Sequence, residues 1–385
     1  MNVATLCCIV GVFCFLVACH PFTTYPWSLV VLQALVPKRR SLTHPAVSPQ
    51  LGCAVCVCAY NEERVIERKV QNLLALREHD PNLEILIYVD AATDGTAEIL
   101  RRYVQQIDLC VGTERRGKTH GMNVLAAKAR ASILVFSDAN VMMDGECVHD
   151  FRRYFADPEI GCVGGSLVYT NATASTTAAS GSFYWRFEEA IKKLEMATGS
   201  MMGADGSVFA VRRSLHKPPP EHIIDDMYVS LMVLCDGYRV IQANDAWAYE
   251  ESVTAAPEEF RRKIRIACQA FNVHRLIWPQ LRQLDRLTLY KYVSHKLIRW
   301  FTIYLLALSA LSFEAAMVVG GYWHAAAAVT GCVAIAFILG FIWSVKPFVQ
   351  IAEIVAAFAG TGVGVWRSLR GERYQTWTPA ASIRS

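Results

Sequence analysis

The chain has 385 residues, enough for one large domain and further elements. It is 53% hydrophobic and 19% charged with a net charge of +4, which is too apolar for a wholly soluble protein. The basic residues form no face interleaved with aromatic ones, so we expect no nucleic-acid partner. The apolar residues are concentrated at the two ends of the chain, which predicts a membrane-anchored protein with a polar middle.

The amino-terminal run Val3–Cys19 is uncharged and close to the ~20 residues that a spanning helix needs. A secretory signal peptide is disfavoured because no basic stretch precedes the run and the apolar character resumes at Trp27–Val36. His20-Pro21 interrupts it, so the second part is a kinked continuation or an interfacial helix. The basic cluster Pro37-Lys-Arg-Arg40 then predicts that the following domain is cytoplasmic.

Strands and helices alternate after a linker at Ser41–Gln50. The predicted strands are Cys53–Ala59, Leu83–Val89, Ile107–Val111 and Ser132–Ser137, and the predicted helices are Glu62–Arg77, Thr96–Val104 and Gly117–Arg130. This order predicts the α/β fold class, with a doubly wound, mostly parallel sheet and a site at the carboxyl ends of its strands. The first strand contains Cys53, Cys56 and Cys58, which lack a second ligand pair and are predicted to be buried thiols.

The regular alternation loosens after Asp144. We predict helices at Glu146–Phe155, Phe183–Met196 and Asp225–Leu234, and strands at Gly161–Tyr169 and Val208–Val211. Asn171–Ser180 is rich in Thr, Ala and Ser and is predicted to be a flexible loop. Pro257–Arg275 reads as a basic amphipathic helix, either at the site or on a membrane surface.

The carboxy-terminal part is membrane-like, with predicted spans at Ile298–Val319 and Trp323–Val345 and a weaker third at Phe348–Trp366. Glu314 is expected to face a helix or a polar cavity, because a carboxylate in lipid is costly. One amino-terminal and three carboxy-terminal spans would put the basic tail Arg367–Arg373 on the side opposite the polar middle. Either the third segment is re-entrant or interfacial, or the amino-terminal region is not one span.

Acidic residues recur where strands end or turns begin. Asp90 follows the second strand, Asp138 ends the fourth and is followed by Asn140, Asp205 lies in a Gly-Ala-Asp-Gly turn, and Asp225-Asp226 begins a helix. Oxygen ligands at strand tips can hold a divalent cation and the phosphates bound to it. The structural alternatives are an Asx turn for Asp90 and a helix cap for one of the Asp225-Asp226 pair.

The motifs lie between about residues 52 and 275. They are Ala59-Tyr-Asn-Glu62, Val89-Asp-Ala-Ala-Thr-Asp-Gly95, Arg116-Gly-Lys-Thr-His-Gly-Met-Asn123, Ser137-Asp-Ala-Asn140, Gly203-Ala-Asp-Gly206 and Ile223-Ile-Asp-Asp226. In this order they resemble the family 2 glycosyltransferases with a GT-A fold, in particular the membrane-anchored branch related to polysaccharide synthases. The resemblance divides the chain into an anchor at 1–40, a cytoplasmic GT-A domain at 41–290, transmembrane helices at 291–370 and a tail at 371–385.

The resemblance implies a nucleotide-sugar donor, held through its uridine by Ala59, Tyr60, Glu62 and Asp90. Lys118 begins a helix and would lie near the nucleotide as a counter-charge. Asp138 would bind the nucleotide through a metal ion, because Asp138 and Asn140 occupy the family's metal-binding D-x-D positions. The implied cofactor is Mg²⁺ or Mn²⁺, which an uncharged Asn140 would hold less strongly than a second carboxylate.

The resemblance also indicates which residues would act on the acceptor. Asp226 matches the family's general base, which would deprotonate the acceptor hydroxyl and give inversion. Asp205, Asp225, Arg262 and Arg265 are candidates for contacts with donor or acceptor. Arg265 matches the Arg of the processive enzymes' Gln-x-x-Arg-Trp motif, whereas Ile266 replaces its Trp, which favours transfer of a single sugar.

The predicted function is therefore an inverting, metal-dependent glycosyltransferase in a multi-pass cell-membrane protein. Its catalytic domain would face the cytoplasm and act on a lipid-linked or glycan acceptor presented at the lipid bilayer. The near alternative is a processive polysaccharide synthase. A transporter component and a catalytically inactive binding protein are the alternatives from other classes.

Overall fold

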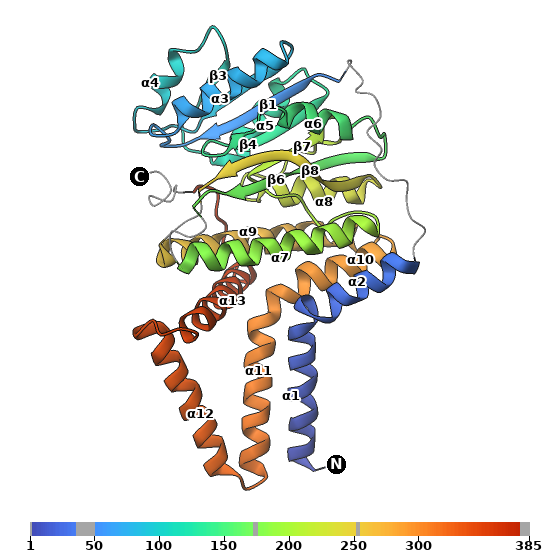
Figure 1. The fold of residues 1–385 in the computed structure, drawn as a ribbon, viewed down its shortest axis with the longest axis vertical. Coiled ribbons are helices and arrows are strands. Elements are labelled where there is room, and N and C mark those ends of the chain that lie inside the picture. The colour runs from blue at the N-terminus through green and yellow to red at the C-terminus, as the bar shows by residue number, and fades with distance from the viewer. Residues whose placement is uncertain (1, 36–50, 172–175, 252–254, 378–385) are drawn as a thin grey trace.

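The computed structural model describes residues 2–35, 51–171, 176–251 and 255–377. The predicted linker Ser41–Gln50 and the basic cluster Pro37-Lys-Arg-Arg40 lie outside these described residues. A mixed sheet forms one half of the molecule, and long helices extend from the other half (Figure 1).

The sheet has eight strands in the order β3-β2-β1-β4-β7-β6-β8-β5. The strands are β1 Cys53–Ala59, β2 Glu84–Val89, β3 Asp108–Val111, β4 Ile133–Asp138, β5 Met142–Met143, β6 Ile160–Tyr169, β7 Val208–Arg212 and β8 Arg239–Glu250. β3, β2, β1 and β4 are parallel, as are β6 and β8, whereas β7 and β5 pair antiparallel to their neighbours. The predicted doubly wound, mostly parallel α/β sheet is confirmed. β8 was not predicted, because polar residues interrupt its apolar pattern.

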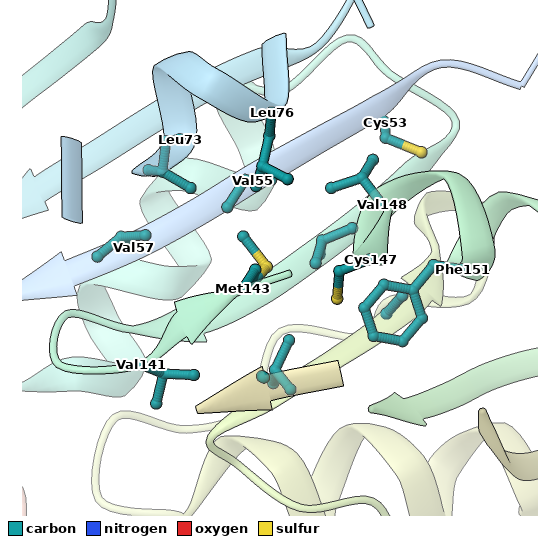
Figure 2. Close-up of a cluster of buried hydrophobic side chains, with 14 of the residues drawn as sticks. Cys53, Val55, Val57, Leu73, Leu76, Val141, Met143, Cys147, Val148 and Phe151 are labelled. Atoms are coloured by element: carbon teal, nitrogen blue, oxygen red, sulfur yellow. The ribbon is translucent and has the colours of Figure 1, made fainter. Parts of the chain in front are cut away.

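Helices cover both faces of the sheet. They are α3 Ile66–His79, α4 Thr96–Arg101, α5 Lys118–Lys128, α6 Cys147–Tyr154 and α8 Asp225–Cys235. Figure 2 shows the core on one face, where Leu73, Val55 and Phe151 pack between α3, β1 and α6. Cys53 and Cys56 are fully buried free thiols, as predicted, and burial raises the pKa of Cys53 to about 11.

Two long helices, α7 Thr176–Ala197 and α9 Ala256–Leu281, lie between the sheet and the apolar helices (Figure 1). The prediction of a loop at Asn171–Ser180 is wrong from Thr176 onward, where α7 begins. The Thr and Ser residues suggested a loop, but such residues are also usual at the start of a helix, and alanine favours its continuation.

The apolar helices are α1 Val3–Cys19, α2 Thr24–Leu35, α10 Arg286–Tyr292, α11 Ile298–Val319, α12 Trp323–Phe337 and α13 Phe348–Leu369. Four segments of the described chain are long and apolar enough to cross a membrane: Val3–Phe22, Arg286–Val319, Trp323–Ile342 and Phe348–Leu369. Thr330 of α12 donates a 2.6 Å hydrogen bond to Glu314 of α11, so Glu314 faces a neighbouring helix as predicted.

The last of these segments, α13, packs along α9 rather than away from the sheet (Figure 1). A Cβ on Gly364 would lie only 2.6 Å from the Ala267 Cβ, so the glycine permits the close approach of the two helices. The chain after α13 returns along α9, where the Gln269 side chain donates to the Tyr374 carbonyl at 2.7 Å. Gln375 then reaches the Arg116 carbonyl, so this part of the tail lies beside α9 and the loop before α5.

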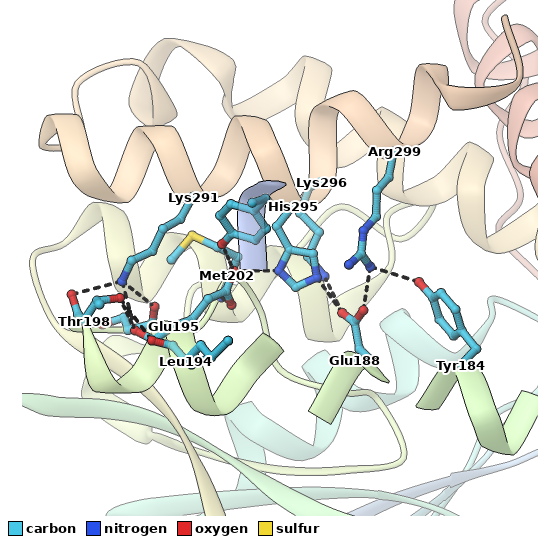
Figure 3. A network of polar contacts seen from close by, with 12 residues as sticks. Tyr184, Glu188, Leu194, Glu195, Thr198, Met202, Lys291, His295, Lys296 and Arg299 are labelled. Carbon is cyan, nitrogen blue, oxygen red and sulfur yellow. Dashed lines mark hydrogen bonds and ion pairs between the residues drawn. The ribbon is translucent and has the colours of Figure 1, made fainter. Parts of the chain in front are cut away.

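A buried polar seam, consisting of Tyr25, Glu188, Glu195, His295 and Arg299, joins α7 to α2 and to the start of α11 (Figure 3). The His295 ring lies 2.6 Å from Glu188 and 2.7 Å from Glu195, and the Tyr25 hydroxyl donates to Glu195 at 2.5 Å. Burial opposes ionisation of Glu188, but Arg299 and His295 outweigh it and hold the pKa of Glu188 well below its usual range. The seam thus attaches the half that contains the sheet to both the amino-terminal and the carboxy-terminal apolar helices.

Glu195→Ala tests the seam, because it leaves Tyr25, His295 and the Met202 amide without their shared acceptor. We expect a loss of about 3–5 kcal/mol in unfolding free energy, the usual effect of breaking a buried ionic network. Thermal unfolding in detergent measures it. Arg102→Ala is the control, since its ion pair with Glu67 is exposed and should cost less than about 1 kcal/mol. Equal losses in the two variants would contradict the role of the seam.

Candidate active site

The carboxyl ends of β1, β2 and β4 meet at one edge of the sheet. Cys58 pairs with Asp138 and Ala59 with Val89, so the residues after these strands are adjacent. β7 runs antiparallel from Val208, which brings the preceding Gly203-Ala-Asp-Gly206 turn to the same edge. Strand topology thus gathers four of the predicted motifs in one place.

The predicted nucleotide-contact residues are mostly in the interior. Asp90 is fully buried, and its carboxylate accepts from the backbone amides of Arg116 at 2.8 Å and Gly117 at 2.9 Å. Ala59 and Glu62 are buried as well, whereas Tyr60 is only partly covered. Asp90 therefore holds the loop that leads into α5, and Tyr60 is the member of this group with an accessible ring.

Lys118 connects the acidic motifs. Its Nζ lies 2.7 Å from Asp138 Oδ1 and 3.8 Å from Asp225 Oδ2, and it donates to the Gly206 carbonyl at 3.3 Å. Burial favours the neutral amine, but Asp138 and Asp225 outweigh it and raise the pKa of Lys118. The lysine is a cation that three separate chain segments share.

Asp226 lies beside this group at the start of α8. Burial and the Asp225 carboxylate raise the pKa of Asp226 to about 7. One of its oxygens accepts from the Met227 amide at 2.6 Å, and a Cβ on Gly206 would be 2.6 Å from the other. Gly206 therefore allows the Asp226 carboxylate to approach the turn. Asp205 in that turn accepts from the Ser207 amide at 3.0 Å.

Glu250, at the end of β8, belongs to the same edge and was not predicted. Its carboxylate accepts from Asn140 Nδ2 at 3.0 Å and from Ser207 Oγ at 3.1 Å. Burial and the nearby Asp138 raise the pKa of Glu250 to about 7. A signal was present in the sequence, because Glu250 is in phase with the buried Ala246 and Ala248 on the inner side of the strand.

The two D-x-D-like positions supply hard oxygen donors, a carboxylate at Asp138 and an amide oxygen at Asn140. Within the described ranges, no group of three or more His, Cys, Asp or Glu side chains forms a ligand set for a metal. Mg²⁺ commonly uses one or two protein carboxylates and takes its other ligands from substrate phosphates and water. The donors therefore fit a Mg²⁺ or Mn²⁺ ion that is bound together with a diphosphate.

The two arginines of α9 take different positions. Arg262 pairs with Glu259 at 2.7 Å and is 45% exposed. Arg265 is partly buried and donates to Gln269 at 3.3 Å. Burial and Arg262 lower the pKa of Arg265, whereas Asp138 and Asp226 act in the opposite direction. Arg265 is thus within electrostatic range of Asp138 and Asp226, and Arg262 within range of Glu250.

The carboxy-terminal tail crosses the accessible side of Tyr60. The Arg115 guanidinium stands 3.7 Å above the Tyr60 ring, the Trp377 ring centroid lies 6.0 Å from that of Tyr60, and Arg115 donates to the Trp377 carbonyl. Gln375 donates to the Arg116 carbonyl at 3.2 Å. The tail thus lies against Tyr60 and the loop before α5, through contacts that no local sequence pattern indicates.

Comparison with known proteins is consistent with this geometry. Residues 54–218 match the glycosyl transferase family 2 model. Poly-beta-1,6-N-acetyl-D-glucosamine synthase of Staphylococcus aureus is 24% identical over 196 residues, which are 49% of this chain and 47% of the relative. The Staphylococcus epidermidis synthase is 24% identical over 293 residues, or 72% and 70% of the two chains. The chain thus spans about half the length of the S. aureus relatives that it matches.

One solved structure shares the fold over nearly the whole chain. The mannosyltransferase PcManGT from Pyrobaculum calidifontis, in complex with GDP-Man and Mn²⁺, has a TM-score of 0.73 and 20% identity. The match covers 95% of this chain and 99% of that one, so it includes the apolar helices as well as the sheet.

Gly117→Ala tests the contact between the tail and the α5 loop. Gly117 has a φ of +94°, which strains an L-residue, and a Cβ there would collide with the Gln375 carbonyl. We expect a loss of about 1–3 kcal/mol in unfolding free energy. The loss should be smaller in a chain that ends at Tyr374, because only the backbone strain remains. Gly145→Ala, which has open space, is the control; an equal loss in the full and shortened chains would show that the tail does not contact Gly117.

Proposed function

This chain carries a glycosyl transferase family 2 domain at residues 54–218, and from that premise we propose that it transfers a sugar from a nucleoside diphosphate sugar to an acceptor hydroxyl. The observation that carries the proposal is the convergence of Lys118 with Asp138 and Asp225, with Asp226 alongside. The lysine and a metal ion on the neighbouring oxygen donors would stabilise the negative charge of a leaving diphosphate. A nearby carboxylate can take the proton of an attacking hydroxyl.

The donor diphosphate would lie at the amino terminus of α5, where Lys118 and the backbone amides supply positive charge. Asp138 and Asn140 would hold Mg²⁺ or Mn²⁺, which when bound offsets the charge on the diphosphate. The nucleobase of the donor would lie near Tyr60 and Trp377. A protein that shares this fold binds GDP-Man with Mn²⁺, which supports the proposal of a divalent cation. For the same reason GDP-sugars are candidate donors together with the UDP-sugars that the motifs favour.

Asp226 would act as the general base. Its pKa of about 7 allows the carboxylate to take a proton near neutral pH, which is the condition for efficient base catalysis. The acceptor oxygen would then attack the anomeric carbon from the face opposite the diphosphate, and this single displacement inverts the configuration. Arg265 would add positive charge on the acceptor side.

The acceptor would come from the membrane. α9 carries Arg265 near the acidic group, and its residue Ala267 packs against Gly364 of α13, so one helix connects the site to the apolar segments. A lipid-linked or glycan acceptor fits this placement. We further propose that the region 41–290 is the cytoplasmic catalytic domain of a multi-pass membrane protein, anchored by 1–40 and 291–370 and followed by a tail at 371–385, of which Gln375 and Trp377 contact the domain.

Similarity to poly-beta-1,6-N-acetyl-D-glucosamine synthases makes a processive synthase the second candidate. Ile266 in place of the processive enzymes' Trp favours transfer of one sugar. Size analysis of the product formed by purified enzyme separates the two, because long polymer would contradict single transfer.

The direct test is a panel of UDP- and GDP-sugars supplied to the detergent-purified chain with Mn²⁺ and a membrane lipid extract. We expect one donor to raise the melting temperature and to release its nucleoside diphosphate when the acceptor is present. Failure of every donor to bind or to react would overturn the proposed activity.

Asp226→Asn tests the base. We expect the rate of transfer to fall at least about 100-fold, since general bases contribute that much or more, while nucleotide affinity changes little. In the unchanged chain kcat should rise with pH and level off above about 7, because the carboxylate acts only when deprotonated. A rate that is independent of pH between 5 and 8, or substantial turnover by the variant, would refute the assignment.

Asn140→Asp tests the metal position. The new carboxylate would lie where an amide now donates to Glu250 at 3.0 Å, so we expect a loss of about 1–3 kcal/mol in unfolding free energy when EDTA is present. Mn²⁺ should reverse the loss and bind more tightly than to the unchanged chain. The double variant Asn140→Asp, Glu250→Gln is the control, because it removes the repulsion between the new carboxylate and that of Glu250. Loss of Mn²⁺ binding in Asn140→Asp would show that residue 140 is not next to the ion.

A further inference from the structure

Lys69 of α3 is a fully buried lysine that the proposed mechanism does not use. Its ammonium donates to Ser137 Oγ at 2.8 Å and to the Val141 carbonyl at 2.5 Å. Burial lowers the pKa of Lys69 to about 7, which shows how costly the charge is at this place. A buried charge is retained only where its oxygen partners offset the loss of water.

The two partners of Lys69 stand on either side of Asp138 and Asn140. Ser137 in turn donates to the Asp138 carbonyl at 3.3 Å, and the Val141 amide donates to the same carbonyl at 3.3 Å. One ammonium therefore ties both ends of the turn that presents the two candidate metal donors.

The next turn of α3 extends the same support. Asn72 accepts from the Met143 amide at 2.9 Å and donates to the Met143 carbonyl at 2.8 Å. Lys69 and Asn72 are three residues apart and so share a helix face. That face of α3 holds the segment from Ser137 to Met143 along its length.

We propose that Lys69 is a positioning residue, which orients Asp138 and Asn140 toward the cation and diphosphate by fixing the Ser137–Val141 turn from behind. The inference rests on the proposed function, since it assumes that these ligands bind at Asp138. Residues that support metal ligands typically contribute 10–100-fold to metal affinity, which gives the scale of the effect.

The test measures Mn²⁺ binding by electron paramagnetic resonance in the presence of UDP or GDP, without any turnover. Lys69→Met should weaken Mn²⁺ affinity by about tenfold or more. Ser137→Ala removes only the hydroxyl and should give a smaller loss, and it keeps the test valid if Lys69→Met fails to fold. Because Lys69 acts partly through Ser137, the loss in the double variant should be less than the sum of the two single losses.

Lys291→Met is the matched control. Lys291 is also buried and donates to the carbonyls of Glu195 and Thr198 at 2.9 and 3.0 Å, far from the turn in sequence. It should lower the melting temperature as Lys69→Met does but leave Mn²⁺ affinity unchanged. Normal Mn²⁺ affinity in folded Lys69→Met, or in Ser137→Ala if Lys69→Met does not fold, would overturn the positioning role alone. An unchanged chain that binds no Mn²⁺ with either nucleotide would overturn the proposed function and this inference with it.

Discussion

Charge balance at one edge of the sheet is the constraint on which the site depends. Asp138, Asp225, Asp226 and Glu250 come from three elements and could not all be ionised together without a cation among them. Lys118 supplies that cation, but it lies closest to Asp138 and Asp225. The carboxyls of Asp226 and Glu250 are left with a pKa of about 7. Burial and Asp225 raise the pKa of Asp226 and Lys118 opposes the rise, so the ion pair neutralises Asp138 and Asp225 while Asp226 keeps a pKa suited to taking a proton.

The helices α7 and α9 connect this edge of the sheet to the apolar helices. α9 reaches the acidic group through Arg265 and packs against α13, while α7 is held by the buried seam around Glu188 and Glu195. Because these contacts join the catalytic half to α2, α11 and α13, the site and the apolar helices form one structure. The return of the tail adds a further connection, which passes from α13 directly to Tyr60.

The sequence predicts those strands that are marked by a local pattern of apolar residues. β1, β2 and β4 are short apolar runs that end in the motif residues, so their order and the placing of Asp90 and Asp138 follow from local patterns. The pairing of β8 and the Trp377 contact join segments that are distant in sequence, which no local period reports. Glu250 is in phase with Ala246 and Ala248, but its place beside Asn140 depends on that pairing. The same holds for Lys69, which in sequence is one polar residue of a helix and in the structure lies against Ser137.

The most direct measurement is an experimental structure of the chain with a nucleoside diphosphate and Mn²⁺, with the ion located by its anomalous scattering. We expect the ion at roughly 2 Å from an Asp138 oxygen, the distance of an oxygen ligand to a small divalent cation. We also expect the diphosphate beside Lys118 at the start of α5, with Asp226 on the side where the acceptor enters. A diphosphate bound elsewhere on the sheet, or an ion without Asp138 as a ligand, would contradict it.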